Sequence, residues 1–194
     1  MKTLFVNACV RPESRTKILA DHLLDKLGGE IEEVNLEKEN IQPLNYETML
    51  ERDETIKNPG GSEHMLKYAK QFAEADTIVF AAPYWDLSFP AMVKNYLESV
   101  TVQGVTFYYN EEGIPQGLCK AQKVYYVMTA GGPTSMSEQS FNFGFDYVKG
   151  LCQLLYGIKD VKCFKAEMLD VIGMDVNAIL DKAKEEMDKE LCER

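Results

Sequence analysis

The sequence predicts an α/β fold, a doubly wound five-stranded parallel sheet of order 2-1-3-4-5 with helices on both faces. Apolar segments alternate along the chain with segments of helical periodicity. The central apolar segments have no polar interruptions, as expected of strands covered on both faces, whereas the second and fifth partly alternate, as edge strands do. With 194 residues, the chain is expected to form a single domain over residues 1–194, with an insertion at about 101–122.

The first part of the chain supplies the first two strands. Thr3 to Val6 are a short apolar strand, and the helical periodicity that follows ends before Gly28, a common helix stop signal. Residues 31–36 partly alternate between apolar and polar side chains, which favours a second strand at the edge of the sheet. Ser62 is expected to cap the helix that leads to the third strand.

The stretch from Thr77 to Val100 is expected to organise the site. Residues 78–82 are uniformly apolar and predict a buried strand, which Pro83 ends. One helical stripe follows, formed by Val93, Tyr96, Leu97 and Val100. The loop between strand and helix carries Tyr84 and Trp85. Because ligands collect beyond the carboxyl ends of parallel strands, these rings are expected to face a flat ligand; the alternative is that they belong to the core.

Residues 101–122 interrupt the alternation of strands and helices. Thr106 to Tyr109 and Ile114 to Leu118 flank a turn, which predicts a hairpin inserted after the third strand and its helix, at the edge of the sheet. Exposed aromatic segments of this kind are usually covered, so a partner subunit is expected here.

The last part of the chain supplies the fourth and fifth strands. Residues 124–128 are a buried run that leads into Thr129 to Pro133, where paired glycines either let the backbone approach a ligand or form an ordinary turn. A helix over about 141–155, a partly alternating strand over 161–167 and a final helix from Asp175 complete the order.

Composition and charge exclude several classes of function. The formal net charge of −10 argues against a nucleic-acid partner, because such binding relies on Lys and Arg. The N-terminal apolar run is too short for a signal peptide and no run is long enough to span a bilayer, so the predicted location is cytoplasmic. The five cysteines are scattered and there are two histidines, so neither a disulfide framework nor a metal site is expected.

The switch point of the predicted sheet lies between strands one and three, so a ligand should bridge the loops that follow them. Ser14, Arg15 and Thr16 open the first helix, where free N–H groups, two hydroxyls and a guanidinium suit a phosphate. The alternative is that Ser14 acts only as a helix cap. No G-x-G-x-x-G motif occurs, so a Rossmann dinucleotide site is not supported.

A set of short motifs falls in order over about the central third of the chain. They are Ala81-Ala82-Pro83, Lys94-Asn95-Tyr96, Gly104-Val105-Thr106-Phe107 with Tyr109, Gly117-Leu118, Lys123 and Gly131-Gly132. On these residues the sequence resembles the FMN-dependent NADH:quinone oxidoreductases and azoreductases of flavodoxin-like fold. The resemblance implies a homodimer that reduces FMN with NADH or NADPH and passes two electrons to a quinone or azo compound by a ping-pong mechanism. It assigns no catalytic side chain, because the cofactor does the chemistry.

The resemblance also implies which residues bind the cofactor. The loop of Ser14 to Thr16 would hold the FMN phosphate, residues 84–87 would lie along the isoalloxazine and residues 129–132 would close over its pyrimidine end. The expected cofactor-binding residues are Cys9, Ser14, Arg15, Thr16, Pro83, Tyr84, Trp85, Asp86, Leu87, Thr129, Ala130, Gly131 and Gly132. Asp86 stands where the family has asparagine, Ala130 where it has arginine and Cys9 where it has serine. These departures bear on substrate preference and flavin potential.

Two other functions fit part of the sequence. Cys9 and Arg15, with five residues between them and Thr16 following, match the phosphate-binding loop of low-molecular-weight tyrosine phosphatases. That chemistry needs a thiolate of depressed pKa and an acid for the leaving group, but the Asp-Pro motif of that family is absent and Glu13 would repel a phosphate. The other alternative is a flavodoxin-type electron carrier, against which the aromatic hairpin speaks, because an enzyme pocket needs walls.

Overall fold

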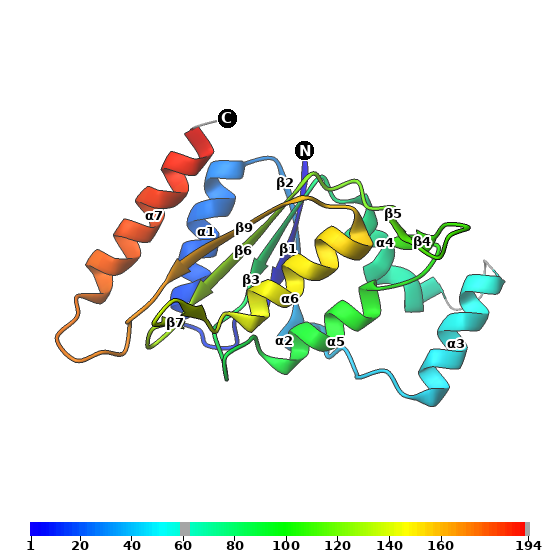
Figure 1. Ribbon diagram of the computed structural model, residues 1–194, viewed down its shortest axis with the longest axis horizontal. Coiled ribbons are helices and arrows are strands. Elements are labelled where there is room, and N and C mark those ends of the chain that lie inside the picture. The colour runs from blue at the N-terminus through cyan, green and yellow to red at the C-terminus, as the bar shows by residue number, and fades with distance from the viewer. Residues whose placement is uncertain (59–62, 193–194) are drawn as a thin grey trace.

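The central sheet has five parallel strands in the order β2-β1-β3-β6-β9, in a computed structural model that describes residues 1–58 and 63–192 (Figure 1). Counted along the chain, this is the order 2-1-3-4-5, so the predicted sheet is confirmed. The strands are β1 (Lys2–Asn7), β2 (Glu30–Asn35), β3 (Thr77–Ala81), β6 (Lys123–Thr129) and β9 (Asp160–Ala166).

Helices cover both faces of this sheet. The helices α1 (Arg15–Leu27) and α7 (Val176–Cys192) pack side by side on one face (Figure 1). The helices α4 (Lys67–Glu74), α5 (Ala91–Val100) and α6 (Phe143–Leu151) pack on the other face. The sheet is therefore sandwiched, and its middle strands are buried except at residues at the ends of β1 and β6.

Strand β3 shows how the central strands divide their side chains between the two faces. Ile78 and Phe80 join the cluster under α4, α5 and α6, whereas Val79 and Ala81 join the cluster under α1 and α7. All four are at most 1% exposed. Because both faces are covered, the strand is uniformly apolar, which is the pattern that the sequence displays.

The segment between β2 and α4 carries shorter helices. These are α2 (Leu36–Glu39), α3 (Tyr46–Lys57) and the 3-10 turn η1 (Glu63–Leu66). The residue expected to cap the helix before β3, Ser62, lies outside the described residues. In the described chain, α4 begins at Lys67, directly after η1.

The strands β4 (Phe107–Tyr109) and β5 (Pro115–Gly117) pair antiparallel within the stretch 101–122. They form a separate two-stranded sheet, so the expected position at the edge of the main sheet is wrong. The reason is where β5 docks: Gly117 lies against the backbone of Tyr156, in the π-helical segment η2 (Cys152–Tyr156) that continues α6.

The carboxyl ends of β1, β3 and β6 meet at one edge of the sheet, because these three strands are parallel neighbours. The loops that leave this edge span residues 8–14, 82–90 and 130–142, and the last contains the two-residue strands β7 (Ser135–Met136) and β8 (Gln139–Ser140). Among the described residues, no helix is both long and apolar enough to cross a membrane.

Candidate active site

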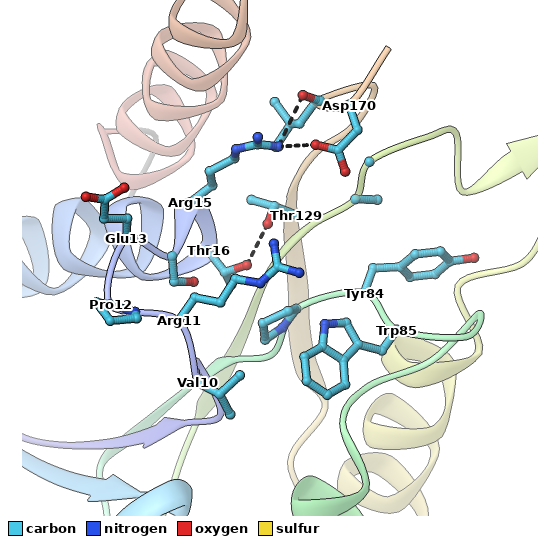
Figure 2. Close-up of a pocket in the computed structure, with 15 residues that line it drawn as sticks. Val10, Arg11, Pro12, Glu13, Arg15, Thr16, Tyr84, Trp85, Thr129 and Asp170 are labelled. Carbon is cyan, nitrogen blue, oxygen red and sulfur yellow. Dashed lines mark hydrogen bonds and ion pairs between the residues drawn. The ribbon is translucent and has the colours of Figure 1, made fainter.

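A cavity of about 630 Å³ opens at this edge, between the N-terminus of α1 and the loop that follows β3 (Figure 2). Its lining comes from the ends of β1, β3, β6 and β9, as expected for a ligand site at the switch point of a doubly wound sheet. The lining residues are Val10, Arg11, Pro12, Glu13, Ser14, Arg15, Thr16, Pro83, Tyr84, Trp85, Thr129, Ala130, Gly131, Leu169 and Asp170.

The N-terminus of α1 forms one wall. Ser14 is the N-cap residue, with extended backbone, and its Oγ accepts a hydrogen bond from the Lys17 N–H at 3.3 Å. The helix has no acidic residue in its first turn. The remaining first-turn N–H groups have no partner within the helix, and the helix dipole adds partial positive charge. This wall suits an anion such as a phosphate.

Two arginines, Arg11 and Arg15, line the cavity. The Arg15 guanidinium is engaged across the cavity, with its Nη1 2.7 Å from Asp170 Oδ1 and 3.1 Å from the Leu169 carbonyl oxygen. Arg11 was not among the predicted residues. Figure 2 shows its side chain extending from the loop after β1 into the space between α1 and the Trp85 turn.

Thr16 and Thr129 tie α1 to the end of β6. Their hydroxyl oxygens lie 2.6 Å apart, and Thr16 is 1% exposed. The floor of the cavity is therefore fixed by a hydrogen bond between two residues that both line it. A short hydroxyl pair of this kind holds the two elements in register.

The loop after β3 forms the aromatic wall. Trp85 and Ser88 exchange two backbone hydrogen bonds of 3.0 and 2.8 Å, and the residues between them, Asp86 and Leu87, both have positive φ, 50° and 66°. This is the backbone of a tight turn that usually carries Asn and Gly. It presents the Trp85 side chain, which is 41% exposed. Neighbouring Tyr84 is fixed, because its hydroxyl donates to the Phe141 carbonyl at 3.0 Å.

The glycine loop after β6 is braced by the loop after β9. The N–H groups of Leu169 and Asp170 donate to the carbonyls of Ala130 and Gly131, at 3.2 and 2.9 Å. A Cβ on Gly131 would lie 2.3 Å from Asp170 Oδ2. A larger residue at this position would therefore have to displace the Asp170 side chain, a contact that the pattern of paired glycines did not reveal.

Cys9 belongs to the loop between β1 and α1 but does not line the cavity. Its thiol is 9% exposed and donates weakly to the Ala81 carbonyl oxygen at 3.8 Å. Burial raises the pKa of the Cys9 thiol to about 11. A phosphatase nucleophile needs a depressed thiol pKa, so this environment argues against the phosphatase alternative.

The structure gathers most of the predicted residues at the cavity. Those that line it are Ser14, Arg15, Thr16, Pro83, Tyr84, Trp85, Thr129, Ala130 and Gly131, whereas Cys9, Asp86, Leu87 and Gly132 lie outside the lining. The sequence analysis missed Val10, Arg11, Pro12, Glu13, Leu169 and Asp170. Their positions in the sequence could have identified them, because each of these residues follows a strand that ends at the same edge of the sheet.

The doubly wound sheet and the cavity at its switch point define a flavodoxin-like protein, and a family model described as "Flavodoxin-like fold" matches residues 1–191. The chain is 39% identical to "FMN-dependent NADH:quinone oxidoreductase 2" of Clostridium acetobutylicum, over 95% of this chain and 97% of that protein. It is 37% identical to the FMN-dependent NADH:quinone oxidoreductase of Lachnoclostridium phytofermentans, over 95% and 94%. The chain belongs to the flavodoxin-like fold family and, within it, to the family of these oxidoreductases.

A solved structure with this fold is the azoreductase from Bacillus anthracis str. Sterne. It superposes with a TM-score of 0.84 at 24% sequence identity, and the match covers all of both chains. The fold that the sequence resemblance implied is therefore confirmed.

Proposed function

We propose that the protein is an FMN-dependent oxidoreductase that takes two electrons from NADH and passes them to a quinone or an azo compound. The observation that carries this proposal is the cavity, which joins a helix N-terminus suited to a phosphate with an aromatic turn suited to a flat ring. The names of the curated relatives support the same cofactor and donor. When bound, FMN supplies the acceptance and release of hydride.

The residues present fit FMN. We assign the phosphate end to Ser14 to Thr16, one side of the ring system to Pro83 to Trp85, and its pyrimidine end to Thr129 to Gly132. Residues 86–87 form the tip of the aromatic turn and fix its shape. Cys9 helps to fix the start of the loop between β1 and α1, since its N–H donates to the Asn7 side-chain oxygen at 2.9 Å.

The protein's own part in the reaction is to bind the cofactor, to orient it and to exclude water from it. Tyr84 serves orientation, because its hydroxyl is committed to the Phe141 carbonyl and burial raises its pKa above the ordinary value. It therefore stays protonated at neutral pH and does not act as a base. Trp85 is the exposed ring of the aromatic wall. The electron donor and the electron acceptor would use this open side in turn, which gives a ping-pong mechanism. NADPH is a second candidate donor.

An absorption spectrum of the purified protein, followed by anaerobic addition of NADH, tests the proposed function. We expect a flavin spectrum that NADH bleaches and that a quinone or an azo dye restores. A flavin spectrum that NADH leaves unchanged would favour the electron-carrier alternative. A protein that binds no flavin, with FMN added in excess, would contradict the proposal.

We further propose a homodimer in which the segment 101–118 contributes to the interface. Four apolar side chains of this segment are 42–50% exposed, which a partner subunit would cover. They are Tyr108, Tyr109, Ile114 and Leu118. Sedimentation should show a dimer for the wild type and a monomer for the variant Tyr108→Ser/Tyr109→Lys. An unaltered dimer in that variant would remove this segment from the interface.

We also place the protein in the cytoplasm. All its cysteines, Cys9, Cys119, Cys152, Cys163 and Cys192, are free thiols, which reducing compartments preserve. Cell fractionation with antibody detection tests this location, and recovery in an extracellular fraction would contradict it.

A further inference from the structure

We propose that Arg11, and not Arg15, provides the guanidinium that binds the phosphate of FMN. The inference rests on the proposed function, because it names the cation of that same site. It follows from the charge balance of the cavity, whose lining contains two cations, Arg11 and Arg15, and two anions, Glu13 and Asp170, among the described residues.

The Arg15 charge is already neutralised within the chain. Its Nη1 contacts both Asp170 Oδ1, at 2.7 Å, and the Leu169 carbonyl oxygen, at 3.1 Å. Figure 2 shows the guanidinium directed toward Asp170, on the side of the cavity formed by the loop after β9. A phosphate at the N-terminus of α1 would have to compete with a carboxylate for this group.

Arg11 has no such commitment. Among residues 1–58 and 63–192, no hydrogen bond or ion pair of its side chain is found, although an arginine carries five N–H donors. Figure 2 shows its side chain reaching into the cavity, while the Glu13 carboxylate points away from it. Arg11 is therefore the uncompensated positive charge of the cavity lining.

The groups around Arg11 complete a phosphate site. Ser14 Oγ accepts from the Lys17 N–H, and the Ser14 side chain also hydrogen-bonds to that of Cys9, so a phosphate would have to draw the Ser14 hydroxyl away from Cys9. The first-turn N–H groups of α1 are further donors. Neutral donors alone compensate a phosphate dianion poorly, whereas a planar guanidinium binds two phosphate oxygens at once. Arg11, in the loop between β1 and α1, supplies this guanidinium.

The test compares the affinity of the apo-protein for FMN and for riboflavin, which lacks the phosphate, by quenching of flavin fluorescence. Arg11→Gln should lower the affinity for FMN by about tenfold or more and leave the affinity for riboflavin within about twofold, because a charge-assisted hydrogen bond is lost. Inorganic phosphate should compete with FMN less effectively in this variant. Arg11→Lys, which keeps the charge, should lie between the two proteins.

Lys17→Gln is the matched control. It also removes one positive charge near the start of α1, but Lys17 lies outside the cavity lining. Its affinity for FMN should stay within about twofold of the wild type. An unchanged FMN-to-riboflavin ratio in Arg11→Gln, or a ratio that falls in Arg15→Gln instead, would overturn the assignment. A wild-type protein that binds neither flavin would contradict the proposed function itself, which separates the two failures.

Discussion

Arg15 and Asp170 form an ion pair that joins the first helix to the loop after the last strand, with 2.7 Å between Nη1 and Oδ1. The Asp170 side chain also lies against Gly131, 2.3 Å from the position that a Cβ would take there. One carboxylate therefore connects three of the loops around the cavity. It also brings a negative charge to a site that we assign to a phosphate, so the pair organises the loops at some cost in anion affinity.

Replacing Asp170 by asparagine should raise the affinity for FMN by a few fold. The change removes a negative charge from the cavity lining and releases Arg15, while a neutral amide preserves the size of the side chain. Stability should fall by no more than about 1 kcal/mol, because the pair is exposed. Titration of apo-protein with FMN measures the effect. Asp181→Asn, on the exposed face of α7, is the control, and an equal gain in both variants would point to net charge alone.

Ser14 has two roles that two substitutions can separate. Ser14→Ala removes both the hydroxyl and the helix cap, whereas Ser14→Gly removes the hydroxyl and keeps most of the capping preference. Both variants should lose the same factor in FMN affinity, about tenfold, but Ser14→Ala should be less stable by about 1 kcal/mol. Urea unfolding and FMN titration measure the two effects. FMN affinity that falls in Ser14→Ala alone would show that Ser14 acts only as a cap.

The docking of the hairpin on η2 depends on one glycine. A Cβ on Gly117 would lie 2.2 Å from the carbonyl carbon and oxygen of Tyr156. Gly117→Ala should therefore destabilise the protein by about 2 kcal/mol or more, because backbone has to move. Gly150→Ala, in α6, is the matched control: nothing lies within 4 Å of its Cβ position, and alanine should stabilise the helix by about 0.5–1 kcal/mol. Denaturant unfolding of both variants tests the contrast.

Glu167 holds the segment after β6 onto the end of β9. Its carboxylate accepts hydrogen bonds from the N–H and the hydroxyl of Thr134 and pairs with Lys165. Burial acts to raise the pKa of Glu167, but these partners outweigh it and lower the pKa below the ordinary value. The carboxylate therefore stabilises the fold at neutral pH, and this contribution is lost as the pH falls below about 4.

The variant Glu167→Gln should lose about 1–3 kcal/mol of stability at pH 7, and its stability should change less than that of the wild type on acidification. Urea unfolding from pH 7 to pH 3 measures both. Glu185→Gln, on the exposed face of α7, should leave the loss of stability at acid pH unchanged. If the free energy of unfolding falls in parallel for the wild type and Glu167→Gln as the pH is lowered, another acidic group causes the loss of stability at acid pH.

The sequence predicts the sheet well, because burial on two faces leaves a direct trace in uniformly apolar runs such as residues 78–82. The N-terminus of α1 is also predictable, since Ser14 carries a local capping signal. The hairpin was placed wrongly, because its position depends on the contact between Gly117 and Tyr156, a packing between distant segments. Local patterns contain no information about such a contact.

The same lack of long-range information in local patterns explains which residues of the candidate site could be predicted and which could not. Thr16 and Thr129 could be assigned to it because both follow from strand and helix ends. The partner of Arg15 could not be predicted, because Asp170 follows in a loop without periodicity and is 155 residues away in sequence. Arg11 was overlooked because a lone arginine in a loop is usually solvated, and only its position in the cavity distinguishes it.

Asp86 allows the most direct test of how this chain adjusts its cofactor. Its φ of 50° is in the left-handed region, which asparagine tolerates best after glycine, so Asp86→Asn changes the charge while preserving the turn. Asp86 is exposed and lies outside the cavity lining, but it directly follows Trp85, which lines the cavity. If its carboxylate is roughly 8 Å from the reduced ring, an effective dielectric of about 40 gives on the order of 1 kcal/mol of repulsion.

For a two-electron couple, about 1 kcal/mol corresponds to roughly 20 mV. Asp86→Asn should therefore raise the midpoint potential of bound FMN by about that amount, because reduction adds negative charge that the wild-type carboxylate opposes. Titration against a redox dye at low ionic strength measures the shift, and added salt should diminish it, since an exposed charge is screened. Asp25→Asn, on α1 and outside the cavity lining, is the control. Equal potentials for Asp86→Asn and the wild type would mean that the carboxylate faces away from the flavin.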